Sequence, residues 1–139
     1  MQSKVVEFSS MKEDFPTLYK ATFAEEFNGI TPMDSDLFCF TYLDVTPLAW
    51  ALMRKTTPTV GYLSWGGVLP EYRGESEVHL NHLFNICIEQ GLKTLNLLTV
   101  RDNTRMQIVA LKNGFIIDGV YAGTQGKMEI MFTRNEVKV

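Results

Sequence analysis

Residues 67–77 read GVLPEYRGESE, and this stretch decides which fold we expect. An apolar run precedes it, Pro70 ends that run, and an amphipathic segment begins near Ser76, shortly after Arg73-Gly74. This order predicts a strand that passes through a loop into a helix. The first-turn amides of such a helix lack partners within it, and with the positive end of the helix dipole they can bind an anion such as a pyrophosphate. Arg73 would add a planar, permanently charged donor, although Gly74 could equally serve only the backbone of the turn.

A second stretch has a related layout. Residues 95–115 read LNLLTVRDNTRMQIVALKNGF. A short apolar run typical of a strand ends at Val100, polar residues follow, and a helix-like segment stops at Asn113-Gly114. An Asn-Gly pair at that place is typical of a left-handed helix C-cap.

Together the two stretches resemble the acyl-CoA-binding motifs of the GNAT N-acetyltransferase family. In that family a strand ending in Val-x-Pro is followed by Gln/Arg-x-x-Gly-x-Gly/Ala. Residues 68–74 match this pattern well, whereas Ser76 stands at a Gly position and Val78 at a Gly or Ala position. The family's second motif, a strand ending in Val, then an Asn, a helix and Lys-x-Gly-Phe, is matched in order by Val100, Asn103, Lys112, Gly114 and Phe115.

The resemblance implies an α/β fold, with a mixed, mostly antiparallel sheet whose splayed central strands are flanked by helices. It also implies that acetyl-CoA lies between those strands and gives its acetyl group to a primary amine by direct attack in a ternary complex. A backbone amide near Val68 would face the thioester oxygen and stabilise its developing negative charge. The residues that the resemblance assigns to cofactor binding are Gly67, Val68, Leu69, Arg73, Gly74, Glu75, Ser76, Glu77, Val78 and Asn103.

The groups that usually handle protons in the family are absent. Tyr62 stands where many members carry a general-base Glu, and Ala110 where many carry a Tyr acid. Tyr62 and Ser64 share a strand face by alternation and are the nearest polar groups, so they are the candidate catalytic residues. A phenol with a pKa near ~10 is a poor base at neutral pH, and both side chains could be structural. A catalytically impaired GNAT-fold binding or assembly module is therefore the alternative.

Composition narrows the function further. The 139 residues are 45% hydrophobic and 21% charged, which predicts one soluble domain over residues 1–139. A net charge of −3 argues against nucleic acid as the main partner. No apolar run approaches the ~20 residues of a membrane span, and the N-terminus lacks a secretory signal, so we expect a cytoplasmic protein. The sequence leaves a homodimer open and does not identify the acceptor amine.

Periodicity and turn residues predict the remaining elements. We interpret Cys39 and Cys87 as reduced core thiols, and His79 and His82 as a partly exposed pair on a helix flank, with no third metal ligand. The run at 48–53 could also be a short buried helix, and Thr46-Pro47 predicts a tight turn before it. Predicted strands cover 4–8, 37–45, 48–53, 60–69, 95–100, 115–122 and 128–133, and predicted helices cover 10–27, 76–90 and 104–112, the second with Val78 on its apolar face.

Overall fold

The structure is a computed structural model that describes residues 2–44, 46–123 and 126–136. Its strands form one seven-stranded sheet in the order β1-β2-β3-β4-β5-β7-β6. The strands are β1 (Gln2–Glu7), β2 (Leu37–Leu43), β3 (Thr46–Thr57), β4 (Val60–Val68), β5 (Thr94–Val100), β6 (Ile116–Ala122) and β7 (Met128–Asn135). The helices are α1 (Phe15–Phe23), α2 (Ser76–Ile88) and α3 (Thr104–Lys112), with 3-10 turns at Phe8–Ser10 and Pro70–Glu75.

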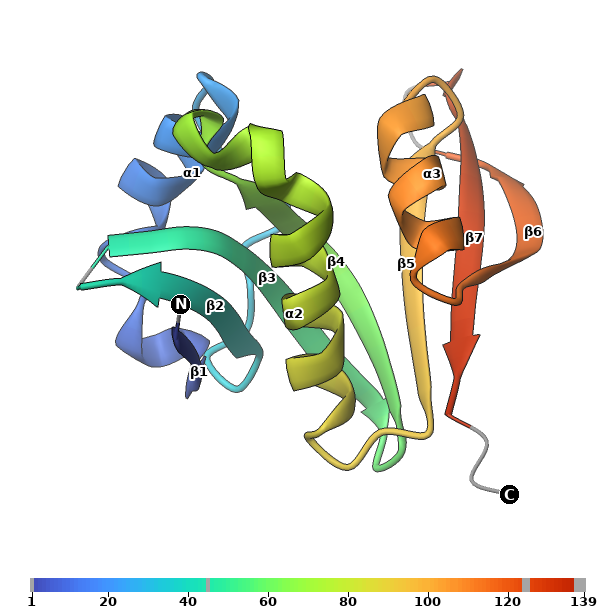
Figure 1. The fold of residues 1–139 in the computed structure, drawn as a ribbon, viewed down its shortest axis with the longest axis horizontal. Helices are drawn as coiled ribbons and strands as arrows, with labels where there is room; N and C mark the ends of the chain where they lie inside the picture. The colour runs from blue at the N-terminus through green and yellow to red at the C-terminus, as the bar shows by residue number, and fades with distance from the viewer. Residues whose placement is uncertain (1, 45, 124–125, 137–139) are drawn as a thin grey trace.

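The sheet is antiparallel except at its centre, where β4 and β5 run parallel. These two strands pair only from Val60 opposite Thr94 to Leu63 opposite Leu97. Beyond that point they diverge, and Figure 1 shows β4 and β5 separating from their common lower end. The predicted fold, a mostly antiparallel sheet with splayed central strands flanked by helices, is therefore confirmed.

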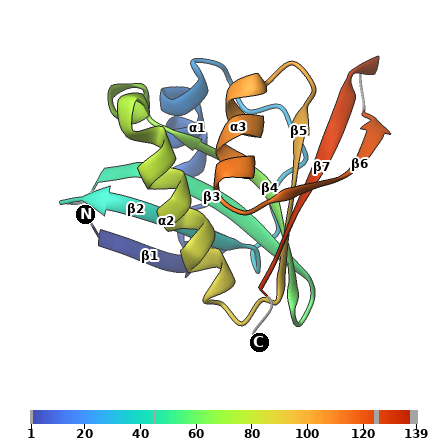
Figure 2. The ribbon, with the colours of Figure 1, turned by 45° about the vertical axis from the view of Figure 1, so that its right-hand side comes forward.

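Two apolar clusters hold the sheet between its helices. One cluster joins α2 and α3 to the strands and includes Leu83, Leu97 and Val109. The other is aromatic, joins α1 to the opposite face, and includes Phe15 and Trp50. Figures 1 and 2 show α2 and α3 lying along the same face, each beside one of the diverging strands. The splay thus leaves an opening between a half built on β1–β4 and a half built on β5–β7.

Several predicted boundaries are wrong. Helix α1 ends at Phe23 and not at residue 27, because Ala24 adopts a left-handed conformation with φ of 59°. The chain reverses at Asp44, which also has a positive φ, so Thr46 and Pro47 open strand β3 and do not form the predicted turn. Residues 48–53 lie within β3, which excludes the short-helix alternative.

Contrary to the prediction, Val78 lies off the apolar face of α2, and His79 lies on it. Val78 is 60% exposed, whereas His79, expected to be partly exposed, is 3% exposed. Residues 79, 83 and 87 follow the four-residue spacing of one helix stripe, and residue 78 lies about 100° away from it. Cys87 lies on the same stripe of α2, next to Cys39 on β2. Both are buried free thiols, and their sulfur atoms lie 3.5 Å apart.

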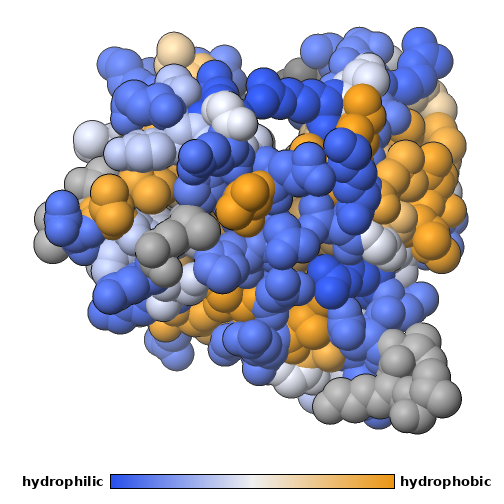
Figure 3. All heavy atoms as spheres, in the orientation of Figure 1, coloured by the Kyte–Doolittle hydropathy of each residue, from blue (hydrophilic) through white to orange (hydrophobic). Residues whose placement is uncertain are grey.

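The outer edge of the sheet carries exposed apolar side chains. Strand β6 exposes Ile116, Ile117 and Val120, each to more than half, and in Figure 3 hydrophobic atoms gather on that side of the molecule. An edge strand of this kind is a common pairing site for another strand, and the homodimer left open by the sequence stays a prediction. Among the described residues, no helix has the length and apolar character to cross a lipid bilayer.

Candidate active site

A cleft of about 1220 Å³ lies between the diverging strands. Its walls include Gly66 and Gly67 from β4 and Thr99 and Val100 from β5. The cleft extends past Ile30 and Pro32 in the loop before β2. Its size suits a ligand as large as a nucleotide cofactor.

The structure brings most of the sequence-predicted site residues to this cleft, but not all of them. The predicted residues that line it are Tyr62, Ser64, Gly67, Val68, Arg73, Ser76 and Asn103. A small adjoining pocket of about 230 Å³ adds Gly74 and Glu77. Leu69 is 6% exposed, and its amide donates to the Leu48 carbonyl at 2.8 Å, so this amide already has a partner in the fold. Glu75 and Val78 line neither of these cavities.

One edge of β4 faces the cleft without a strand partner. On its other edge β4 pairs with β3 as far as Val68, opposite Ala49. Within the described residues its pairing with β5 stops at Leu63, so the main chain from Ser64 to Val68 has no neighbouring strand on the cleft side. Backbone groups along such an edge can bind an extended ligand in the manner of an added strand.

The glycine pair in β4 has a packing role. A Cβ atom on Gly67 would come within 2.6 Å of Thr22 Cγ2 and 2.9 Å of the Phe23 ring, so α1 requires a glycine at this position. Strand β4 has a bulge at Ser64, because Leu52 pairs with Trp65 and Met53 with Leu63, which leaves Ser64 as the extra residue. The Ser64 hydroxyl donates weakly to the Leu52 carbonyl at 3.4 Å.

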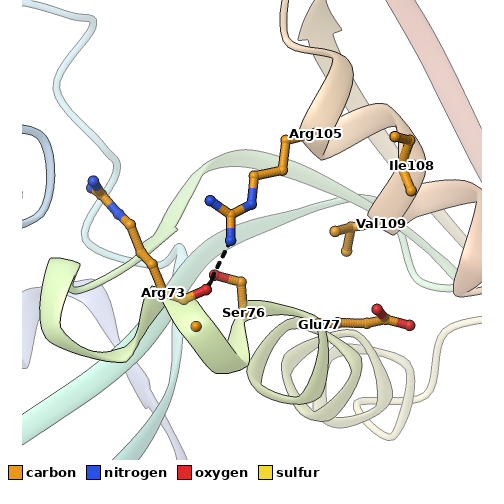
Figure 4. Close-up of a pocket in the computed structure, with 7 residues that line it drawn as sticks. Arg73, Ser76, Glu77, Arg105, Ile108 and Val109 are labelled. Carbon is orange, nitrogen blue, oxygen red and sulfur yellow. Dashed lines mark hydrogen bonds between the residues drawn. The ribbon is translucent and has the colours of Figure 1, made fainter.

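Arg73 points away from the predicted phosphate pocket. Its Nε donates to the Val68 carbonyl at 3.2 Å, and its Nη2 donates to the Thr22 carbonyl at the end of α1. Figure 4 shows the Arg73 side chain directed to the far side of the loop, away from Glu77 and Val109. Arg73 therefore ties the loop to α1, and its guanidinium would have to leave these carbonyls to reach an anion in the pocket.

Arg105 occupies the position where a cation was expected. It comes from the first turn of α3, and its Nη2 donates to the Arg73 carbonyl at 2.8 Å across the opening (Figure 4). Arg105 lines both cavities. Arg105 was not identified from the sequence. A signal was present, however, since a basic side chain in the first turn of a helix opposes the helix dipole and therefore suggests another role.

The loop before α2 is more regular than the sequence suggested. Residues 70–75 form a 3-10 turn that runs directly into α2, and the Ser76 amide donates to the Arg73 carbonyl. The Ser76 hydroxyl donates to the same carbonyl at 2.7 Å. Two acidic residues here have partners. Glu77 forms an ion pair with Lys112 at 3.4 Å, and Glu75 lies 3.8 Å from His79.

Both candidate catalytic residues line the cleft, where Tyr62 is half-buried and Ser64 is exposed. Burial, and secondarily the negative charge of Glu129, raise the pKa of Tyr62, which makes it a still weaker base at neutral pH. Asn103 caps α3, because its Oδ1 accepts from the Met106 amide at 3.2 Å. Glu129 on β7 lines the same cleft as Tyr62 and was not identified from the sequence. Within the described chain no three His, Cys, Asp or Glu side chains are grouped as metal ligands.

Solved structures of low sequence identity share this architecture. The ribosomal-protein-S18-alanine N-acetyltransferase of Escherichia coli superposes with a TM-score of 0.73 at 16% identity, covering 96% of this chain and 94% of that one. An acetyltransferase of the GNAT family from Desulfovibrio desulfuricans gives 0.68 at 14% identity, with 96% and 99% covered. The chain has the GNAT N-acetyltransferase fold. A GNAT acetyltransferase from Elizabethkingia anophelis with acetyl-CoA bound gives 0.63 at 12% identity, with 73% and 77% covered.

The likeness lies in the structure and not in the sequence. No protein-family model matches the sequence, and no curated protein matches it. Both stretches whose motifs suggested the family, residues 67–77 and 95–115, contribute residues to the lining of the cleft between β4 and β5.

Proposed function

We propose that the chain is an N-acyltransferase that moves an acetyl group from acetyl-CoA to a primary amine by direct attack in a ternary complex. The observation that carries this proposal is the unpaired edge of β4 from Ser64 to Val68, which faces a cleft of about 1220 Å³. An open strand edge beside a cleft of that size suits an extended thioester arm that needs both backbone hydrogen bonds and room. The bound acetyl-CoA in the Elizabethkingia anophelis protein supports the same ligand class.

In this proposal the pantetheine arm lies along β4. The backbone of Gly67 and Val68 holds it, and an amide near Val68 stabilises the negative charge that develops on the thioester oxygen. Leu69 contributes less than the sequence suggested, because its amide already donates to Leu48. Gly74, Ser76 and Glu77 form the small pocket at the start of α2, where the pyrophosphate would lie.

The cation for the phosphates in this proposal is Arg105. Arg105 and Arg73 both line the small pocket, but Arg105 makes one hydrogen bond to a carbonyl of the fold, whereas Arg73 makes two. Asn103 lies at the same end of α3 and lines the cleft, where it can order water near the thiol. Tyr62, kept protonated by its raised pKa, and Ser64 serve as hydrogen-bonding groups near the acetyl end.

Calorimetry with acetyl-CoA tests the ligand, and a free-thiol assay with a panel of primary amines tests the reaction. We expect saturable binding and amine-dependent release of thiol. Binding without thiol release from any amine would support the non-catalytic module instead. Absence of binding at millimolar acetyl-CoA would contradict both the enzyme and the cofactor site.

A further inference from the structure

Glu129 is a carboxylate in the cleft that the GNAT-like motifs do not explain. It lies near the start of β7, is half-buried, and lines the cleft together with Tyr62, Ser64 and Gly66. Its neighbours along β7, Ile130 and Phe132, are buried in the core on the side of α2 and α3. Strand alternation therefore directs Glu129 to the opposite face of the sheet, which also carries Tyr62.

The register of the strands places Glu129 beside the predicted thioester position. Val60 pairs with Thr94 and Leu63 with Leu97, and the same offset carried forward brings Val100 level with Gly66. Glu129 is the residue of β7 that pairs with Val100. The carboxylate therefore lies across the opening from Gly66-Gly67, at the height where the proposed acetyl group would emerge from the cofactor arm.

The Glu129 side chain packs against Gly123, where a larger residue would collide with it. A Cβ atom on Gly123 would come within 2.7 Å of Glu129 Cδ, so a glycine at that position leaves the acidic side chain its room. Among the described residues no basic side chain forms an ion pair with Glu129 and none donates a hydrogen bond to it. A half-buried carboxylate that faces a cleft without a described cation beside it is available to a cationic ligand.

Among the described residues, few positively charged side chains lie around Glu129. Tyr62 lines the same cleft from β4, and burial together with the Glu129 charge raises its pKa. Strand β5 presents Val100, and β6 presents Tyr121 in register with Glu129, while Asp118 lies further along β6. Lys127, just before β7, is exposed. The site thus combines one carboxylate with aromatic rings, a combination that favours ammonium groups.

We propose that Glu129 binds the ammonium group of the acceptor amine and accepts its proton before acetyl transfer. This inference rests on the proposed function and deepens it. One proton passes from R–NH₃⁺ to the Glu129 carboxylate, and the lone pair of the resulting R–NH₂ attacks the thioester carbonyl. The C–N bond forms, the C–S bond breaks with its electron pair on sulfur, and the second proton of the attacking nitrogen neutralises the thiolate. Glu129 then returns its proton to water.

The same geometry indicates the class of acceptor. The cleft is also lined by Ile30, which is 89% exposed, and by Trp65. The other acidic residue that lines it, Asp36, is already paired with Arg54 through two hydrogen bonds of 2.7 and 2.8 Å. We therefore expect a primary amine with a single cationic head and an apolar body.

The test compares Glu129→Gln with Asp118→Asn, which removes an exposed carboxylate from the adjacent strand. Titrations followed by NMR use n-hexylamine and its neutral counterpart 1-hexanol as probes. We expect the wild-type protein and Asp118→Asn to bind the amine at least ~10-fold more tightly than the alcohol, and Glu129→Gln to bind the two alike. An equal affinity of the wild-type protein for both probes would overturn the inference, and so would a preference that survives in Glu129→Gln.

A kinetic arm separates proton transfer from binding. With an amine that the protein acetylates, Glu129→Gln should lower kcat/KM by about 100-fold or more and remove the acidic limb of its pH profile, while Glu129→Asp should recover part of both. An unchanged profile in Glu129→Gln would refute Glu129 as the proton acceptor. Acetyl-CoA affinity is measured separately in each variant, so failure of the cofactor site, and with it of the proposed function, is distinguished from failure of this inference.

Discussion

Two arginines near the start of α2 should have separable effects on stability and on binding. The Arg73 guanidinium donates to the carbonyls of Val68 and Thr22, and it thereby links the loop before α2 to the end of α1. Hydrogen bonds from charged groups contribute ~1.5–3 kcal/mol each. Because the Arg73 side chain is partly exposed, we take a lower value, and expect Arg73→Ala to reduce the free energy of unfolding by about 2–3 kcal/mol in total.

Replacing Arg105 should have the opposite effects, with little loss of stability and a marked loss of acetyl-CoA affinity. It is exposed and makes a single hydrogen bond of 2.8 Å, to the Arg73 carbonyl. Its loss should change the free energy of unfolding by no more than about 0.5 kcal/mol. If Arg105 contacts the phosphates of acetyl-CoA, Arg105→Ala should weaken binding by about 10-fold or more, the equivalent of a charge-assisted contact.

Urea unfolding followed by tryptophan fluorescence measures the first effect, and calorimetry with acetyl-CoA measures the second. Arg101→Ala is the matched control, because Arg101 is an exposed arginine shortly before α3 that lines neither cavity. The reasoning is refuted if Arg73→Ala keeps wild-type stability while losing affinity. It is equally refuted if Arg105→Ala binds acetyl-CoA as the control does.

Two further predictions concern the motif departures and the buried thiols. The double variant Ser76→Gly with Val78→Ala should bind acetyl-CoA more tightly than the wild-type protein in calorimetry. Because Val78 is 60% exposed, its truncation should leave the urea midpoint nearly unchanged. An unchanged affinity in the double variant would show that neither side chain hinders the pyrophosphate. The hydrogen bond with Cys39, together with burial, raises the pKa of Cys87 well above its ordinary value. The unfolded thiol ionises near ~8.5 while the folded one stays protonated, so the free energy of unfolding should fall as pH rises above ~8.5, by up to about 1.4 kcal/mol per pH unit. Urea titrations from pH 7 to pH 9.5 should show this slope in the wild-type protein and a smaller one in Cys87→Ala, and equal slopes would contradict the assignment.

Local chemistry made the order of elements predictable from sequence. Helix α3 begins and ends where the sequence indicates, because Asn103 accepts from the Met106 amide and Gly114 takes a positive φ of 84° just after the helix. The strand-loop-helix junction at residues 68–76 was likewise visible, since Pro70 and Gly74 interrupt the apolar pattern at fixed places. These signals depend only on residues close in sequence, so they can be recognised without knowledge of the tertiary contacts.

Sequence patterns were insufficient where a distant segment of the chain determines which groups a residue contacts. Arg73 was predicted to bind an anion, and the sequence did not indicate that its guanidinium donates to the Thr22 carbonyl, 51 residues away. Val78 was wrongly placed on the apolar face of α2, because His79, and not Val78, is buried there and lies against the Tyr72 ring. Glu129 could not be found from motifs, since only the insertion of β7 between β5 and β6 brings it beside the cleft.

The candidate site is divided between the two halves that the splay creates. The β4 edge and the start of α2 come from one half, whereas Arg105 and Glu129 come from the other. Side chains cross the opening from α3 to the region of α2 at three places, through Arg105 with the Arg73 carbonyl, Lys112 with Glu77, and Asn113 with Asn81. An anion that binds Arg105 competes with the Arg73 carbonyl for the same donor. Ligand binding at the phosphate end would thus replace one of the bridges that set the width of the cleft, and the distance between the β4 edge and Glu129 depends on that width.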